Sequence, residues 1–389
     1  MADDLSAIDR EGFARELDAL RVELEAEISV EDFAHLRKLE RWASACTVIG
    51  YATGWLAPNP LSAIALSLGS TARWTIVVHH VSHKSMDKVP GIPERYTSRV
   101  FAQGQRRMLD WFDWMLPEAW HHEHDVLHHF HTGELADPDL VEENVSVIRD
   151  AKIPKVLKYA AVAFYAATWK LTYYTPNTFQ ILKRAQKRRA RRGGTEEARG
   201  DEPYLAVLDP RTDVGREFWR RCLLPYGLGR FVAIPAAFLP LGPWAAFSVW
   251  ANSVAAEVLT NVHTFLIIAP NHAGDDVYRF DTPAHGRAEL YLRQVAGSAN
   301  YTTGGDLRDF LQGFLNYQIE HHLFPTLPPR KYQQMQPRVK AICARYGVPY
   351  VQQSLFRRVK KLVDVMVGNT SMRHGITRAG GGEHAAAAE

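Results

Sequence analysis

The sequence predicts an all-α integral membrane protein, with four transmembrane helices in two hairpins and a cytoplasmic cap of histidine-rich helices. Long apolar runs occur in two pairs along the 389 residues. Basic side chains gather at one end of each pair, and thirteen of the 17 histidines lie at or just beyond those ends. The alternative is a soluble protein with buried helices, because Arg73 and Arg230 interrupt two of the runs.

Each apolar run is near the roughly 17–25 residues that cross the hydrocarbon of a membrane. The runs cover residues 42–57, 61–78, 223–242 and 244–268. APNP (57–60) joins the first two and PLGPW (240–244) joins the last two, and such proline-rich turns suit helix ends. The opposite ends carry Arg37, Lys38, Arg41, Lys84, Lys88, Arg216, Arg220 and Arg221. By the positive-inside rule these basic ends face the cytoplasm.

The two ends of the chain differ from the membrane region between them. Residues 1–40 form an N-terminal segment, with one amphipathic helix predicted over 7–40. Its apolar residues at helical spacing are Leu17, Leu20, Leu24 and Ile28. Residues 41–366 are expected to form a single membrane domain. The Gly- and Ala-rich end, 367–389, is expected to be disordered.

The segment 155–182 is long enough to span a membrane but is not predicted to cross. A crossing would place the basic tract AQKRRARR (185–192) outside, against the charge rule. Lys158, Lys170 and several tyrosines suit a helix that lies in the interface. A basic tract can bind nucleic acid, but beside membrane segments it indicates contact with anionic lipid. We therefore expect membrane lipid, and no nucleic acid, as a partner.

The histidines are concentrated in four stretches near the predicted cytoplasmic ends. HHVSH contains His79, His80 and His83, and HHEHDVLHHFH contains His121, His122, His124, His128, His129 and His131. His263 lies in the last apolar run, His272 follows it, and QIEHH contains Gln318, His321 and His322. Residues four apart share a helix face, as in His79–His83 and His124–His128. Because imidazole is a common ligand for iron and zinc, these clusters predict a polyhistidine metal site.

The composition of the clusters favours two redox iron ions over hydrolytic zinc. HHEHD lacks the second histidine of an HExxH zinc motif. Cys46, Cys222 and Cys343 are too widely spaced for a thiolate site or a disulfide framework. Acids beside the histidines, such as Asp125, are too few at helical spacing for a carboxylate-bridged site. We expect them to orient imidazoles instead.

At these residues the sequence resembles the membrane-bound fatty acid desaturases. The three histidine boxes of that family are matched by HHVSH, HDVLHH and QIEHH, and Trp120 stands four places before the second box. The stretch NYQIEHHLFPTLPP, with Gln318 in the last box, is similar to the front-end, acyl-lipid subgroup. The resemblance runs from about residue 70 to about residue 360.

The resemblance implies four membrane helices, a di-iron centre at the cytoplasmic face and O2-dependent insertion of a double bond into a fatty acyl chain. The implied iron ligands are His79, His83, His124, His128, His129, His321 and His322. An extra ligand at the end of the fourth helix is either His263 or His272. Residues expected to orient ligands, or to occupy ligand-like positions, are His80, His121, His122, Asp125, Gln318 and Glu257.

The remaining partners follow from the same resemblance. No HPGG haem motif of a fused cytochrome b5 domain occurs in the sequence, so we expect a separate electron donor of the ferredoxin or cytochrome b5 type. The substrate is an acyl lipid or an acyl thioester. Candidates to line an acyl channel are Trp74, Trp111, Trp114 and Tyr301. Asn252 and Glu257 are functional candidates because polar side chains are costly within a span.

Two alternatives use the same residues. A hydroxylase or ketolase acting on a lipid or hydrocarbon would begin with the same hydrogen abstraction at the same polyhistidine site. A membrane receptor or transporter would bind metal without redox chemistry, but we would then expect ionisable groups near the membrane midplane. The histidines lie at the ends of the predicted spans instead, which favours an enzyme.

Overall fold

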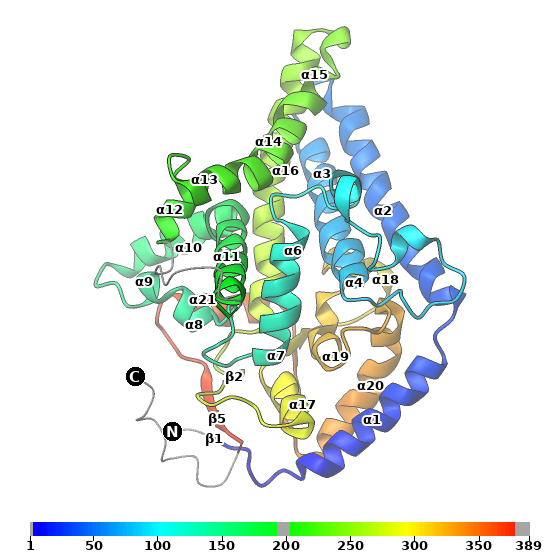
Figure 1. The fold of residues 1–389 in the computed structure, drawn as a ribbon, viewed down its shortest axis with the longest axis vertical. Coiled ribbons are helices and arrows are strands. Elements are labelled where there is room, and N and C mark those ends of the chain that lie inside the picture. Colours follow the sequence, from blue (N-terminus) through cyan, green and yellow to red (C-terminus); the bar gives the residue numbers. More distant parts are fainter. Residues whose placement is uncertain (1–2, 193–202, 378–389) are drawn as a thin grey trace. The chain divides into compact units, whose positions relative to one another are not determined.

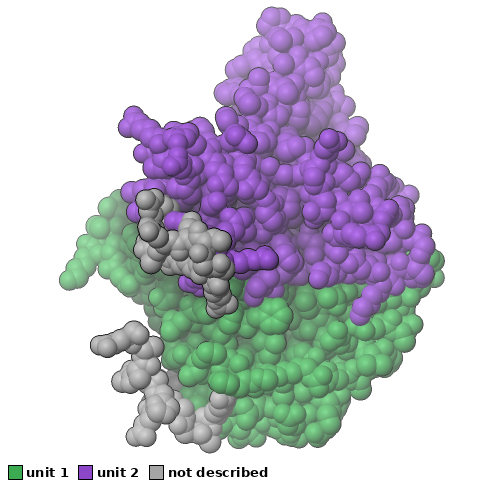
Figure 2. All heavy atoms as spheres, in the orientation of Figure 1, with its two compact units in different colours: residues 1–32, 127–162, 266–389 green, residues 33–126, 163–265 purple. Residues whose placement is uncertain are grey.

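The computed structural model describes residues 3–192 and 203–377, which are mostly helical (Figure 1). The chain forms two compact units that alternate along the sequence (Figure 2). Unit 1 comprises residues 1–32, 127–162 and 266–389, and unit 2 comprises residues 33–126 and 163–265. Each unit therefore joins segments that are distant in the sequence, and the predicted membrane domain, 41–366, contributes to both.

Unit 2 is helical in its described part, and α2 and α16 each extend a few residues into unit 1. Its helices are α2 (Val30–Gly54), α3 (Pro60–Ala72), α4 (His79–Ser82), α5 (Arg107–Asp110), α6 (Pro117–Trp120), the second half of α10 (Lys155–Trp169), α11 (Thr175–Arg192), α12 (Tyr204–Leu208), α13 (Asp213–Phe218), α14 (Leu224–Leu228), α15 (Ile234–Ala236) and α16 (Pro243–Ile268). Wider π-helical turns, η1 (Arg73–Val78) and η4 (His121–His128), precede or carry two of the histidine stretches. Such turns are frequent at functional sites.

Three helices of the described chain are long and apolar enough to cross a membrane. They cover Pro60–Ser82, Asp213–Leu241 and Pro243–Asn271. The predicted span 42–57 is not among them, because it is the second half of α2, whose first half is charged and whose end is Gly54. The apolar half of α2 is about 20 Å long at the standard helical rise, shorter than the roughly 30 Å of hydrocarbon.

The apolar half of α2 nevertheless packs closely on α3. A Cβ added at Gly69 would lie 2.9 Å from the carbonyl oxygen of Ala43, so only glycine allows this approach of the two backbones. Small residues at such crossings are typical of helix pairs in membranes.

Both proline-rich turns of unit 2 lie at the same end of the helices. Asn252 of α16 donates from Nδ2 to the carbonyls of Gly54 (2.9 Å) and Ala57 (3.1 Å) and accepts from the N–H of Asn59 (2.9 Å). Trp244 donates from Nε1 to the carbonyl of Leu56 at 3.0 Å. The start of α16 therefore holds the turn between α2 and α3.

Unit 1 surrounds short parallel strand pairs with helices. Its helices include α1 (Arg10–Ala26), α7 (His129–His131), α8 (Val141–Asn144), α9 (Ser146–Arg149), α17 (Arg287–Ala296), α18 (Asp306–Leu311), α19 (Gln318–Leu323), α20 (Pro329–Tyr346) and α21 (Leu355–Met366). Its strands are β1 (Asp3–Asp4), β2 (Tyr278–Arg279), β3 (Ala299–Tyr301), β4 (Val351–Gln353) and β5 (Arg373–Ile376). Strand β5 pairs with β1 and β2, and β3 pairs with β4.

Two predictions for the chain ends differ from the structure. The helix predicted over 7–40 is broken between α1 and α2, where the Asp32 carboxylate accepts from the N–H of Ser29 and begins a new helix. The tail predicted to be disordered over 367–389 contains β5, because pairing with β1 and β2 satisfies its backbone groups. Residues 378–389 of that tail lie outside the described part.

The remaining segment predictions concern the membrane. The segment 155–182 is helical through α10, η5 (Lys170–Tyr174) and most of α11, and it is not among the three candidate spans of the described chain. Its place in the interface stays a prediction. Leu17, Leu20 and Leu24 of α1 are buried within unit 1, as the periodicity of the N-terminal segment indicates.

Candidate metal centre

Three histidines converge in unit 2. His79 and His83 come from the end of the Pro60–Ser82 helix, and His124 comes from η4. Their nearest ring nitrogens all lie within 4.8 Å of one another, and Nε2 of His79 is 3.2 Å from Nε2 of His124. All three side chains are at most 9% exposed. One ion could therefore bind all three imidazoles.

Neighbouring groups orient the rings of this cluster, through Nδ1 in His79 and His83 and through ring stacking in His124. His79 donates from Nδ1 to the carbonyl of Thr75 at 3.2 Å, and Nδ1 of His83 lies 3.1 Å from a carboxylate oxygen of Asp125. Trp120 stacks on His124 with ring centroids 4.5 Å apart and an interplanar angle of 25°. Anchoring at Nδ1 fixes the tautomer of His79 and leaves its Nε2 as the metal-binding atom.

Five histidines converge in unit 1. They are His128, His129, His272, His321 and His322. Ligand atoms of His128, His272 and His322 lie within 4.8 Å of one another. His129 stacks on His322 with centroids 4.4 Å apart, and His321 lies edge-on to His129 at 4.8 Å. The second and third histidine stretches and the loop after α16 therefore meet in one buried cluster.

Three hydrogen-bond acceptors outside the histidine stretches orient the unit 1 rings. His128 donates from Nδ1 to Asp137 at 2.8 Å, and His272 donates from Nδ1 to the carbonyl of Gly297 at 3.2 Å. His322 donates from Nδ1 to Oε1 of Gln294 at 2.7 Å. Nε2 of His322 is buried without a hydrogen-bond partner among the described residues, which is the arrangement that a metal ligand needs.

Gln294 and Asp137 each connect a ring to the backbone around it. Gln294, which is 2% exposed, also donates from Nε2 to the carbonyl of His129, so its amide bridges the second and third histidine stretches. The other oxygen of Asp137 accepts from the N–H of Gly133 at 2.8 Å. Neither residue was predicted, because both reach the cluster only through the tertiary fold.

Gln318 occupies a ligand-like position without offering an oxygen to the cluster. Its Oε1 accepts from Nδ2 of Asn271 at 2.9 Å, and its Nε2 lies 3.0 Å from Nε2 of His272. Asn271 is itself fixed by donation to the carbonyl of Leu315 at 2.9 Å. The amide of Gln318 therefore faces His272 with its N–H group, so the side chain must move if His272 is to bind a metal through Nε2.

Burial keeps several of these imidazoles neutral, which is the form that binds metal. Burial, with a smaller contribution from the neighbouring His128, lowers the pKa of His272 to about 3. Burial and the nearby rings also hold the pKa of His322 well below its ordinary value. Burial alone would lower the pKa of His128, but the carboxylate of Asp137 outweighs it and raises that pKa.

The other predicted histidines lie outside both clusters. His80 donates from Nδ1 to the carbonyl of Ile76 at 2.7 Å and is buried, which indicates packing. His121 is bonded to Asp125, so this carboxylate contacts both His121 and His83. His122 is half-buried, and His131 lies 2.8 Å from Glu134 through Nδ1.

His263 and Glu257 both lie on α16 within unit 2. His263 is half-buried and is not in any group of metal-type side chains found among the described residues of that unit. Glu257 accepts from Nε1 of Trp114 and from the hydroxyl of Tyr226, each at 2.7 Å. Both carboxylate oxygens of Glu257 are thus used in hydrogen bonds to aromatic side chains.

A cavity of about 590 Å³ lies among the apolar helices of unit 2. Two of the predicted channel aromatics, Trp74 and Trp111, line it, as does Glu257. Trp114 reaches it only through its bond to Glu257, and Tyr301 is buried in unit 1, where its hydroxyl donates to the carbonyl of Ile267 at 3.0 Å. The volume is in the range of small-molecule sites.

The fold and these clusters together define a class: helical proteins with candidate membrane spans and buried polyhistidine clusters of metal-site geometry. The family model described as "Fatty acid desaturase" matches residues 53–354, which is most of the chain. The chain therefore belongs to the fatty acid desaturase family, and it is an oxidoreductase. This membership removes the support for a receptor or transporter without redox chemistry.

Several curated proteins that are similar to this chain are named as desaturases. The chain is 26% identical over 363 residues to a "NADPH-dependent stearoyl-CoA 9-desaturase" of Mycobacterium tuberculosis, covering 90% of this chain and 77% of that protein. It is 27% identical to the "Acyl-lipid (7-3)-desaturase, chloroplastic" of Chlamydomonas reinhardtii, covering 79% of this chain and 56% of the relative. It is 24% identical to "Fatty acid desaturase 3" of Bos taurus, covering 76% and 58%.

Proposed function

We propose that this protein uses two iron ions and O2 to insert a double bond into a fatty acyl chain. The observation that carries the proposal is the convergence of two buried histidine clusters whose rings are held at the nitrogen opposite the cluster. We assign one iron to His79, His83 and His124, and the other to His128, His272 and His322. His129 and His321 are further proposed ligands, since the ring of His129 contacts both His322 and His321.

The residues divide the work between binding and orientation. When bound, iron supplies the oxidising power that breaks an unactivated C–H bond, which acid–base groups cannot do. Asp137, Gly297 and Gln294 hold the imidazoles of unit 1 in the neutral tautomers that ligate. We assign the extra ligand to His272, because it lies with His128 and His322, whereas His263 lies in no such group.

The reaction needs electrons from another protein. Forming one double bond removes two protons and two electrons from the acyl chain, while reduction of O2 to two waters takes four electrons and four protons. The donor must therefore supply two electrons and the solvent two protons. We assign this role to a separate ferredoxin-type or cytochrome b5-type carrier.

We also propose a membrane topology with two hairpins. The two proline-rich turns of unit 2 lie together at one end, held by Asn252 and Trp244, and His79 and His83 lie at the other end of the Pro60–Ser82 helix. In this arrangement α2 makes the fourth crossing with its charged half outside the hydrocarbon. The basic flanks place the histidine ends in the cytoplasm.

The test is the fatty-acid profile of an aerobic host that expresses the protein, measured by gas chromatography and mass spectrometry. A His128→Ala variant is the matched control, because it removes a ligand and leaves the rest of the chain unchanged. We expect a new unsaturated acid with the intact protein only. A new hydroxy or keto acid would instead favour the hydroxylase or ketolase, and iron-free or zinc-only purified protein would contradict the di-iron assignment.

A further inference from the structure

Unit 2 has a second pocket, of about 510 Å³, beside its histidine cluster. Ser82 and Lys84, the two chain neighbours of His83, both line it, and so does His121 at the start of η4. Because His83 belongs to the proposed iron site, a ligand in this pocket would lie close to that site. None of the roles described above uses this pocket.

Arg107 gives the pocket its chemical character. Its Nε and Nη2 atoms are buried and have no hydrogen-bond partner among the residues that the structure describes. Burial lowers the pKa of Arg107, because a guanidinium loses its hydration there. The adjacent Arg106 differs, since it binds both oxygens of Asp110 at 2.8 and 2.7 Å. A half-buried guanidinium with two unpaired nitrogens beside a pocket favours an anion with two acceptor oxygens.

The remaining charges of the pocket do not satisfy Arg107. Lys84 adds a second cation to the lining. The carboxylate of Glu118 also lines the pocket, but it forms an ion pair with Arg221. The pocket is therefore cationic on balance.

Strained backbone surrounds the same pocket. Three non-glycine residues in the described chain have positive φ, and two of them, Lys84 (62°) and Ala102 (58°), line this pocket. Gly104, a third lining residue, has a φ of 53°. Such conformations persist where the surrounding structure enforces them, and they concentrate at ligand sites.

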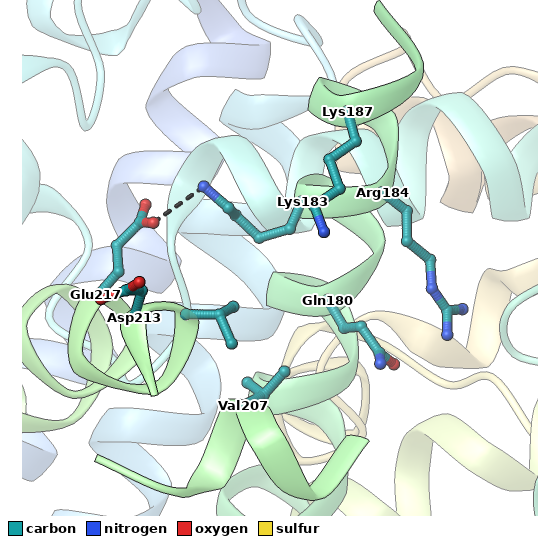
Figure 3. A pocket seen from close by; sticks show the side chains of 8 residues that line it. Gln180, Lys183, Arg184, Lys187, Val207, Asp213 and Glu217 are labelled. Carbon is teal, nitrogen blue, oxygen red and sulfur yellow. Dashed lines mark hydrogen bonds and ion pairs between the residues drawn. The ribbon is translucent and has the colours of Figure 1, made fainter. Parts of the chain in front are cut away.

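The other basic pocket of unit 2 lacks this character. It is smaller, about 210 Å³, and lies between α11 and α12–α13. Figure 3 shows that Lys183 reaches across it to Glu217, with Nζ and Oε2 2.9 Å apart. Two acids, Asp213 and Glu217, line it beside three bases, Lys183, Arg184 and Lys187, so two of the three basic charges are offset there.

We propose that the pocket at Arg107 and Lys84 binds the phosphate group of the acyl carrier. Arg107 donates from Nε and Nη2 to two phosphate oxygens, and Lys84 adds its charge. The inference rests on the proposed function, since it names the head of that substrate. The pocket lies within the roughly 300–1,000 Å³ of small-molecule sites, so it also admits the group attached to the phosphate. Phospholipids and phosphopantetheine thioesters both carry such a phosphate.

The test measures binding by calorimetry to the purified full chain in dodecyl maltoside, a detergent without phosphate. The probes are coenzyme A and monomeric dihexanoyl-phosphatidylglycerol. We expect one of them to bind, and Arg107→Met to weaken it roughly 10- to 100-fold by removing charge-assisted hydrogen bonds. Arg99→Met is the control, because Arg99 is 78% exposed in its side chain and pairs with Glu94 outside the pocket.

The probes separate the two carriers, and the variants separate binding from folding. Binding of coenzyme A alone indicates a thioester carrier, and binding of the phospholipid alone indicates a lipid carrier. Arg107→Met should melt no lower than the wild type, because it removes two buried nitrogens that have no hydrogen-bond partner among the described residues. Equal binding by Arg107→Met, or binding of neither probe by the wild type, would overturn the proposal. If the host makes no new fatty acid but Arg107→Met still loses the probe, the desaturation fails and the pocket stands.

Discussion

At the scale of single residues, the histidines were the part of the site that could be predicted from the sequence. His79–His83 and His124–His128 are local pairs, so helical spacing alone brings each pair to one face. The groups that orient the imidazole rings could not be predicted from the sequence in this way. Asp137 comes from a loop and Gln294 from α17, and no local pattern links either of them to a histidine.

Gln294 allows the importance of such orientation to be measured. Replacing it with leucine removes the nearer acceptor of His322 Nδ1, leaving the Thr132 hydroxyl at 3.1 Å, and it removes the donor to the His129 carbonyl. We expect iron affinity to fall roughly 10- to 100-fold, as for other residues that orient metal ligands. Iron per chain after dialysis against a graded chelator measures it. Gln312→Leu is the control, since the side chain of Gln312 donates to the carbonyl of Thr302. Equal iron retention by Gln294→Leu and the wild type would contradict the role.

At the scale of elements, the loop that carries His272 depends on one buried side chain. Arg358 of α21 is fully buried and donates to the carbonyls of Pro270 and Ala273, two residues before and one residue after His272. It also pairs with Asp276. We expect Arg358→Met to lower the free energy of unfolding by about 3–5 kcal/mol, because it strands buried carbonyls and a carboxylate.

Thermal unfolding in detergent measures this change, and Arg357→Met on the exposed side of the same helix is its control. Arg358→Lys keeps the charge but loses the planar donor set, so it should recover only part of the stability. Wild-type stability in Arg358→Met would show that the loop is held by other contacts.

The ion pair between Arg358 and Asp276 predicts a response to acid. Burial alone would raise the pKa of Asp276, but Arg358 and Lys361 outweigh it and hold the pKa below the ordinary 3.8. The unfolded chain therefore binds this proton first, so the pair stabilises the fold above pH 3.8 and is lost as the pH falls below it. Asp276→Asn should flatten the loss of stability below that pH. Melting curves measured over a pH series test this. If Asp276→Asn lost as much stability below pH 3.8 as the wild type, the contribution of the ion pair would be contradicted.

The turn between α2 and α3 depends on Asn252. Its polarity within a predicted span suggested a functional role, but its side chain makes three hydrogen bonds to that turn. We expect Asn252→Leu to cost about 2–4 kcal/mol of stability. Unfolding by detergent titration measures this, with Val254→Leu on the same helix as the control. If Asn252→Leu did not change the stability, Trp244 alone would hold the turn.

Element boundaries were harder to predict than element types. The spans 61–78, 223–242 and 244–268 follow from hydropathy, which is a local property. The first and last lie within candidate spans of the structure, and 223–242 extends one residue beyond the end of its candidate span. The end of α2 at Gly54 and the break at Ser29 depend on capping and on packing against α3. Strand β5 could not be predicted, because its four residues pair only with distant strands.

At the scale of the whole molecule, the sequence suggested one membrane domain, whereas the chain folds as two interleaved units. Contacts between segments such as 127–162 and 266–377 depend on tertiary packing, which hydropathy and spacing do not report. Both units contain histidines of the predicted site. His79, His83 and His124 lie in unit 2, and His128, His272 and His322 lie in unit 1.

The distribution of the histidines over the two units predicts how iron is lost. Because each unit contains its own converging imidazoles, a ligand change in one unit should leave the other cluster intact. We expect about two iron ions per wild-type chain, about one in His83→Ala, about one in His322→Ala and none in the double variant. Iron and protein assays on purified chains measure this, with His374→Ala as a control because His374 pairs with Asp281. If either single change removed all the iron, the two clusters would have to bind metal as one cooperative site.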